Sequence, residues 1–211
     1  MSPVRTHLRL LVAAVLVALA AAGCFSVDDG FPSVNGCKLK PNTVCEDKDL
    51  SGEDLIQAQL LNAQMAGVDL SDADLTQAQL TNADIREANL SNADLTQATL
   101  ANTIFDGSDL RGAELTQVSS NNTRFRGADL RGNDLANIDF LNADFRDAKL
   151  ASVDLSGANL QNADLTGADL TGADLSNADL LNADFTGAKL AGADLTGANT
   201  QNTVGLQAAT G

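Results

Sequence analysis

The chain of 211 residues contains no Trp and no Tyr, seven Phe, and a single histidine, His7. Because aromatic residues make up only 3% of it, any core has to be assembled mainly from small aliphatic side chains. One His near the N-terminus also excludes His-based triads and His acid–base catalysis from the rest of the chain. We therefore expect no enzymatic activity and no cofactor.

Basic residues are also few, with 13 Lys and Arg against 28 Asp and Glu, so the formal net charge is −15. Such an acidic chain is not expected to bind nucleic acid or an anionic membrane surface as a whole.

The N-terminus has the pattern of an export signal. Basic residues precede an apolar run at 10–22, which is shorter than the about 20 residues of a stable membrane anchor, so 1–23 is predicted to be a signal peptide. The run ends in LAAAGC, which resembles the lipobox of bacterial lipoproteins, although Ala21 stands where that family usually has Leu. The resemblance implies that Cys24 becomes the lipidated first residue. Ordinary signal peptidase cleavage within the preceding alanines is the alternative.

The cysteine count bears on this choice. Three cysteines in an exported protein leave one unpaired, whereas a lipid on Cys24 leaves Cys37 and Cys45 as a pair across a short loop. We predict a disulfide between them, within an N-terminal linker and cap at 24–47. The mature protein, with a charge of −17 after loss of two Arg, is expected to be lipid-anchored to a bacterial membrane and to face the periplasm or the exterior.

Nearly everything else in the chain is one repeat. Every fifth residue from Leu50 to Leu195 is a core candidate, and 22 of these 30 positions are Leu and five are Phe. Two places earlier, 20 of the 30 residues are Ala. A period of five fits neither a helix nor an alternating strand, so short extended segments alternating with turns, coiled into a solenoid, are predicted.

Strings such as Ala168-Asp169-Leu170-Thr171-Gly172 resemble the A(D/N)LXX motif of the pentapeptide-repeat proteins, and the resemblance covers about 46–200. It implies an all-β fold, a right-handed quadrilateral β-helix of about seven coils with four pentapeptides each. The β-helix is expected over 48–200, followed by a short tail at 201–211.

Residue types on the surface are sorted with a period of 20, which independently supports a coil of that length. Acidic residues recur at 54, 74, 94, 114, 134, 154, 174 and 194, and four core Phe recur at 105, 125, 145 and 185. Members of one column are expected about 4.8 Å apart, where amides form ladders and rings stack.

Three surfaces are candidate sites. The acidic face carries the acidic column, where weak Ca²⁺ or Mg²⁺ binding is an alternative to plain solvation. The Asn face is the least charged and is a candidate partner surface formed by Asn62, Asn82, Asn102, Asn122, Asn142, Asn162 and Asn182 with Leu61, Leu141 and Leu181. A candidate basic patch, which either balances neighbouring Asp or docks an anionic group, comprises Arg86, Arg111, Arg124, Arg126, Arg131 and Arg146.

The repeat is weakest at residues 119–122 and at Asn133, which stand at or near inward positions. Buried polar groups bonded to turn backbone would explain them, and a local bulge that forms a site is the alternative.

Two functions follow. The first is a lipid-anchored, non-enzymatic scaffold in the bacterial envelope whose partner is an unknown protein or polysaccharide, with homodimerisation through the terminal coils left open. The second comes from the family resemblance, since some pentapeptide-repeat proteins are acidic DNA mimics that act on gyrase, a type II topoisomerase. The export signal, the basic patch and the lack of a helical segment after the repeats count against it.

Overall fold

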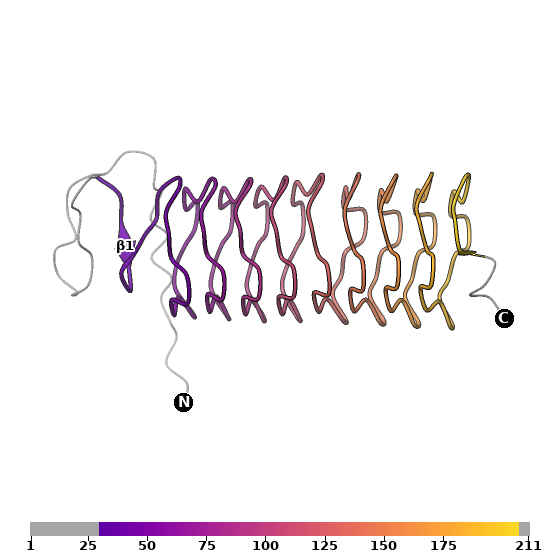
Figure 1. Ribbon diagram of the computed structural model, residues 1–211, viewed down its shortest axis with the longest axis horizontal. Coiled ribbons are helices and arrows are strands. Elements are labelled where there is room, and N and C mark those ends of the chain that lie inside the picture. Colours follow the sequence, from indigo (N-terminus) through magenta and orange to yellow (C-terminus); the bar gives the residue numbers. More distant parts are fainter. Residues whose placement is uncertain (1–29, 207–211) are drawn as a thin grey trace, which may run out of the picture.

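The computed structural model describes residues 30–206, and in it the chain forms a rod of stacked coils with a small hairpin at one end (Figure 1). The hairpin consists of β1 (Ser33–Val34) and β2 (Cys37–Lys38), which pair antiparallel. The predicted signal peptide 1–23 and the predicted lipidation site, Cys24, lie outside the described residues. Within 30–206, no helix is long and apolar enough to cross a membrane.

The coils are joined by parallel backbone pairing between residues 20 apart, from Val44 with Gln64 to Asp184 with Val204. In a typical hydrogen bond between coils, the N–H of Leu75 donates to the carbonyl of Asp94 at 2.7 Å. The chain is therefore an all-β solenoid with 20 residues per coil, and each coil contains four of the five-residue units found in the sequence. The ladder begins a few residues before the expected boundary at 48.

A tight turn ends each five-residue unit and explains why Asn and Gly recur there. The N–H of Ala63 donates to the carbonyl of Leu60 at 3.0 Å. The residue between them that closes the turn, Asn62, has a φ of 55°. Positive φ is cheapest for Gly and is tolerated best by Asn among other residues. The same conformation recurs at five-residue intervals along the rod.

The central Leu and Phe residues and the small residues before them fill the interior. Leu75 and Leu165 are fully buried, and each such side chain contributes about 1.5–3 kcal/mol before the entropy of ordering is subtracted. Phe105, Phe125 and Phe145 stack along one column, with ring centroids 5.3 and 5.0 Å apart. Phe140 packs edge-on against two of them.

The N-terminal cap is the hairpin. Asn35 and Gly36, with φ values of 49° and 79°, form the Asn-Gly turn that suits a two-residue hairpin loop. A disulfide joins Cys37 of β2 to Cys45. Because Cys45 stands one period before the buried Met65, this bond ties the cap directly to the core column of the first coil.

Candidate binding surfaces of the rod

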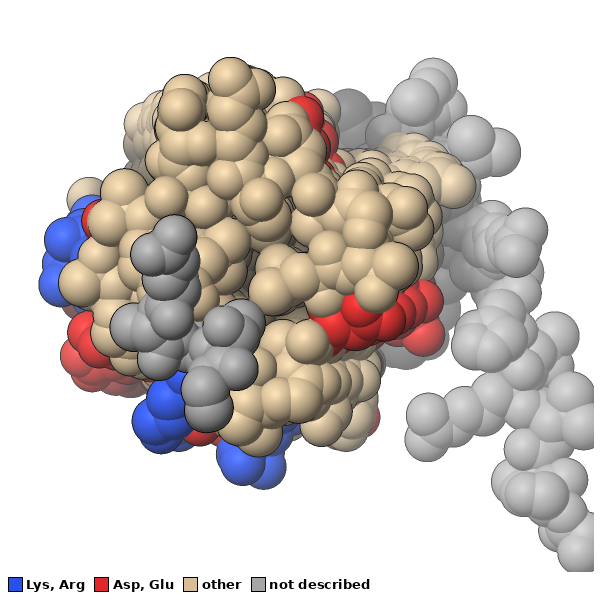
Figure 2. All heavy atoms as spheres, turned by 90° about the vertical axis from the view of Figure 1, so that its right-hand side faces the viewer, with Lys and Arg blue, Asp and Glu red and all other residues tan. Residues whose placement is uncertain are grey.

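Charge is unevenly distributed around the rod. In the end-on view of Figure 2, Lys and Arg gather on the left and lower sides, close to acidic groups, whereas a row of Asp and Glu runs along the right side without them. The five-residue units that carry the acidic column contain no Lys or Arg between 53 and 197. The acidic face and the basic patch are therefore separate surfaces.

The acidic column has a structural role in every described coil except that of Glu114. The backbone N–H of Thr76 donates to Oδ1 of Asp74 at 3.0 Å, and that of Ser176 donates to Oδ1 of Asp174 at 2.8 Å. This is the local turn bond that makes Asp favourable beside a tight turn. Among residues 30–206 no three His, Cys, Asp or Glu side chains are grouped to hold a metal ion.

The Asn face carries an amide ladder in two segments. Nδ2 of Asn82 donates to Oδ1 of Asn62 at 3.0 Å, and the same bond repeats along the column as far as Asn202 with one exception. In the described part of the chain, no such bond joins Asn102 and Asn122. A second ladder of Gln side chains on the acidic face ends at Gln117.

The leucines of the Asn face present less apolar surface than an outward position suggests. Leu61 is 36% exposed, whereas Leu141 and Leu181 are half-buried. The face is therefore mainly a row of amides.

The basic patch is neutralised locally. Five of its six arginines form ion pairs with Asp in the same or the adjacent coil, and the sixth, Arg126, donates its backbone N–H to Asp106 at 3.2 Å. The pairs are Arg86 with Asp84, Arg111 with Asp109, Arg124 with Asp106, Arg131 with Asp129, and Arg146 with Asp144.

The ion pairs lower the pKa of the Asp carboxyl groups that take part in them. Hydrogen bonds from the guanidinium groups lower the pKa of Asp84, Asp109 and Asp129 below its ordinary value. Burial raises the pKa of Asp144, but the hydrogen bonds and the charge of Arg146 outweigh it, so the net shift is downward. The arrangement favours charge balance over a free docking site for an anion.

The regular ladder is interrupted at mid-rod, on the acidic face. The N–H of Leu95 donates to the carbonyl of Glu114 at 2.8 Å. One coil later, among the residues that the structure describes, the N–H groups of Leu115 and Gln117 have no backbone partner. Glu114 and Asp134 likewise form no bridge, although their column is paired on either side. A cavity of about 240 Å³ lies here, lined by residues 112–116 and 132–134.

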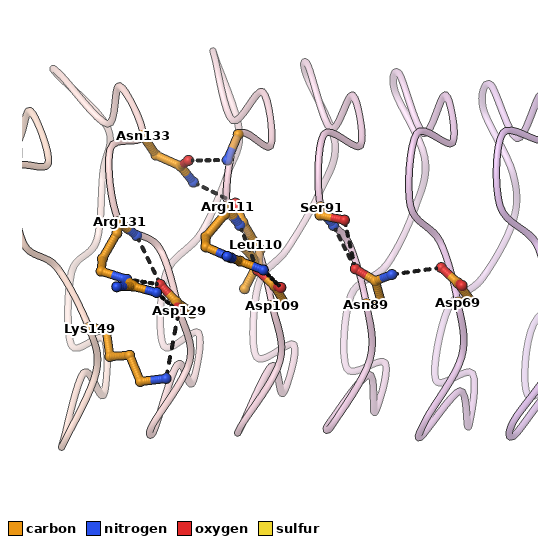
Figure 3. A network of polar contacts seen from close by, with 11 residues as sticks. Asp69, Asn89, Ser91, Asp109, Leu110, Arg111, Asp129, Arg131, Asn133 and Lys149 are labelled. Atoms are coloured by element: carbon orange, nitrogen blue, oxygen red, sulfur yellow. Dashed lines mark hydrogen bonds and ion pairs between the residues drawn. The ribbon is translucent and has the colours of Figure 1, made fainter.

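Asn133 accounts for the interruption. It stands at an inward position that is usually Ala and is 96% buried, as its 4% exposure shows. Its Oδ1 accepts the N–H of Gly112 at 2.8 Å and its Nδ2 donates to the carbonyl of Leu110 at 2.9 Å, so the amide sits between two coils (Figure 3). Val118 and Ile138 also replace Ala at inward positions nearby, but the bridge beside them, between Ser119 and Asp139, is formed.

The weak positions of the repeat thus have different outcomes. Ser120 is fully buried, and its hydroxyl donates to the carbonyl of Asp139 at 2.7 Å. It is therefore a buried polar group bonded to backbone, but to a bridge residue of the adjacent coil and not to a turn. Asn133 instead marks an opening. Nothing in the residue type of Glu114 indicates its place at the interruption; the sequence signal is the polar Asn133 at an inward position.

Comparison with known proteins places this solenoid in a family. Residues 46–77, 78–117, 123–162 and 163–199 match the family model described as pentapeptide repeats, in eight copies. The chain belongs to the pentapeptide-repeat family. Residues 118–122, which the matches omit, are the unit that directly follows the interrupted one. No match is found among curated protein sequences.

Several solved structures are similar. HetL, a pentapeptide repeat protein involved in heterocyst differentiation regulation from the cyanobacterium Nostoc, is 28% identical over 78% of this chain and 87% of that chain, with a TM-score of 0.49. Full-length QnrB1, a plasmid-mediated fluoroquinolone resistance protein, is 18% identical over 78% and 94%, with a TM-score of 0.30. A pentapeptide repeat protein from the Arabidopsis thaliana thylakoid lumen is 26% identical over 61% and 66%, with a TM-score of 0.18.

Proposed function

We propose that the protein is an exported, lipid-anchored rod that serves as a non-enzymatic binding surface or scaffold in the bacterial cell envelope. In this proposal, residues 1–23 are removed, Cys24 carries the lipid, and the solenoid is the right-handed, four-sided helix of its family with about seven complete coils. Its partner is a protein or an envelope polysaccharide.

The observation that carries the proposal is the pairing of the cysteines. Cys37 and Cys45 are bonded to one another, and a structural disulfide suits an oxidising compartment outside the cytoplasm. The remaining cysteine, Cys24, follows a short apolar run with a basic start, where a lipoprotein carries its acyl chains.

The intact mass of the protein from its native host, with its partition between membrane and soluble fractions, tests the proposal. We expect a diacyl- or triacylglyceryl mass on a chain that starts at Cys24, and loss of both lipid and membrane association in Cys24→Ala. Ser26→Ala is the matched control and should behave as wild type. An unmodified chain that retains Met1 and is found in the cytosol would contradict the proposal.

The second candidate is a cytoplasmic DNA mimic that inhibits or protects a type II topoisomerase. The acidic column, which repeats along the rod with no basic residue in its own units, is the observation that favours it. The test is a gyrase supercoiling assay with the purified protein. Inhibition or protection that is lost when Asp54, Asp74 and Asp94 are changed together to Asn would favour this function over a scaffold.

A further inference from the structure

The two ends of the rod differ in how their cores are covered. At the N-terminal end the hairpin lies beside the first coil (Figure 1). Its Val34 and Leu39 are buried as part of the core, and Nδ2 of Asn35 donates to the carbonyl of Asp49 at 2.8 Å. The central Leu55 of the first coil is only 1% exposed. The hairpin therefore covers this end.

The last coil, residues 186–205, has no such cover within the described part of the chain. Its central Leu195 and the preceding Ala193 are only partly buried, although Leu206 also packs against the core. One coil earlier, Leu175 is fully buried. The C-terminal end of the rod is therefore a layer of apolar side chains that is incompletely shielded from solvent.

The backbone of the last coil also has unused hydrogen-bonding groups. In a regular unit, the N–H of the central residue donates to the next coil, and the carbonyl of the small residue two places earlier accepts from it. Among residues 30–206, the N–H groups of Leu190 and Leu195 and the carbonyl groups of Ala188 and Ala193 have no backbone partner. Unpaired edges of this kind accept another β-strand through main-chain hydrogen bonds.

Charge allows two copies of this end to approach one another. The last coil contains one Lys and one Asp, so its formal charge is 0, whereas the preceding coil, 166–185, contains four Asp and no Lys or Arg. Every coil from 46 to 185 has more acidic than basic residues. Two such rods repel one another along their sides, and the C-terminal coil is where that repulsion is weakest.

The two charges of the last coil are placed for a symmetric contact. Lys189 and Asp194 hold the same place in consecutive units, directly before the central residue. When the unit of Leu190 runs antiparallel to the second copy's unit of Leu195, the N–H of each leucine meets a free carbonyl of the other copy. Lys189 then stands opposite the second copy's Asp194, and opposite charges in this position stabilise a strand pair. Two-fold symmetry forms the pair twice.

The intramolecular partner of Lys189 does not prevent this contact. Its Nζ lies 3.2 Å from Oδ2 of Asp169, but the Lys189 side chain is 69% exposed. It is therefore able to face a second carboxylate.

We propose that the C-terminal end of the rod, formed by residues 186–205, binds the same end of a second copy of the chain. Because the hairpin covers the other end, the contact joins like ends and closes at two molecules, whereas a contact between unlike ends would continue as a filament. Residues 207–211 have the length of one unit, so they cannot cover all four units of the coil. The inference concerns the solenoid and does not depend on export or lipidation.

The test is sedimentation velocity of the purified full-length chain over a range of concentrations, in a non-ionic detergent that shields the apolar run at 10–22. We expect an equilibrium between monomer and dimer, without larger species. Hydrogen exchange at the amides of Leu190 and Leu195 should slow as the dimer forms, whereas exchange at Leu175, which is paired in the monomer, should not change.

Charge exchange locates the contact. Lys189→Asp places acidic residues opposite one another in both halves of the dimer, so it should raise the dissociation constant at least about tenfold. Asp194→Lys should have a similar effect. The double variant restores opposite charges and should return the constant to within about threefold of wild type. Asp194 also accepts the N–H of Thr196, and rescue in the double variant separates the charge effect from the loss of this bond.

Lys149→Asp is the matched control. Lys149 lies two coils earlier in the same column as Lys189 and also forms an ion pair with an Asp of the preceding coil, at 3.5 Å. The substitution makes the same change in net charge and should leave the dissociation constant unchanged.

A chain that stays monomeric at every concentration overturns the proposal. Slow exchange at Leu190 and Leu195 in that monomer would show that residues 207–211 cover the end, and fast exchange would leave it to a different protein. Equal losses in Lys189→Asp and Lys149→Asp, or a double variant that does not recover, would also overturn it. Dimers without protection of Leu190 and Leu195 would place the contact elsewhere, with the same consequence.

Discussion

Two stretches of the rod have the same five-residue repeat but differ in the backbone pairing between adjacent coils. From 141 to 195 the inward small positions are Ala or Val, and the parallel bridges continue without a gap. From 111 to 140 these positions include Asn133, Val118 and Ile138, and the bridge between Glu114 and Asp134 is missing. Apart from the partly buried Leu195, the large central residues of both stretches are buried. Because the bridge between Ser119 and Asp139, beside Val118 and Ile138, is formed, the loss of pairing follows the polar amide of Asn133 and not the size of the inward residue.

Truncating a central leucine should have the largest effect and should differ between the two stretches. Leu155→Ala leaves a cavity among closed coils and should lower the free energy of unfolding by about 2–5 kcal/mol. Leu115→Ala, beside an existing cavity, should cost less because its surroundings can relax further. Chemical denaturation measures both variants, and equal losses would contradict the view that the interrupted coils are packed more loosely.

Opening the disulfide tests whether the cap or the mid-rod is the weaker region. Changing Cys37 and Cys45 together to Ala removes a bond that closes a short loop, and should cost roughly 2–3 kcal/mol. Hydrogen exchange should then rise first in the hairpin and the first coil, while the rate at Leu115 stays as it was. Reduction of the wild type is the matched control. A parallel rise at Leu115 would show that the two regions are coupled.

Moving the inserted amide tests its role directly. Ala173 stands two coils beyond Asn133 and is buried in a regular coil, so Ala173→Asn should cost about 1–3 kcal/mol by burying a polar group and should speed exchange at the amide of Leu155. Asn133→Ala should do the reverse at mid-rod and stabilise by about 1 kcal/mol. Native-state hydrogen exchange measures the effect of both substitutions. Unchanged exchange at Leu155 in Ala173→Asn would mean that a buried Asn is not sufficient to interrupt the pairing of coils.

The smallest expected effect concerns pH. The pKa of Asp144 in the folded protein is below the ordinary 3.8, so its ion pair stabilises the fold above that pH, and the contribution is lost as pH falls through the folded pKa. Arg146→Gln should therefore lose less stability than wild type between pH 7 and pH 3, by under about 1 kcal/mol because the pair is partly exposed. Denaturation midpoints at the two pH values measure the difference.

Arg126→Gln is the matched control for the pH experiment, because Arg126 lies one coil away in the same column. Among the described residues its side chain forms no ion pair, so its loss should alter the pH dependence less. Equal changes in the two variants would assign the effect to overall charge.

The sequence was sufficient to predict the family, the core positions and the period of 20, because a Leu every fifth place and an Asn every twentieth leave little freedom in how the chain coils. It did not show that Asp74 accepts the N–H of Thr76, because Asp favours turns in general and the particular bond depends on backbone geometry. The interruption was predicted only as an alternative, a local bulge at residues 119–122 and Asn133. A polar residue type does not show whether its amide is accommodated between paired coils or interrupts their pairing.

The turn residues and columns also constrain how a gene for such a rod can change length. Deleting or duplicating five residues leaves every central Leu in the core, but it moves all later columns to the neighbouring face, so that the acidic column would continue beyond the change on a different side. An indel of 20 residues preserves both the core and every face. If partners bind these faces, insertions and deletions between related rods should accumulate in multiples of 20, whereas selection on folding alone would accept multiples of five.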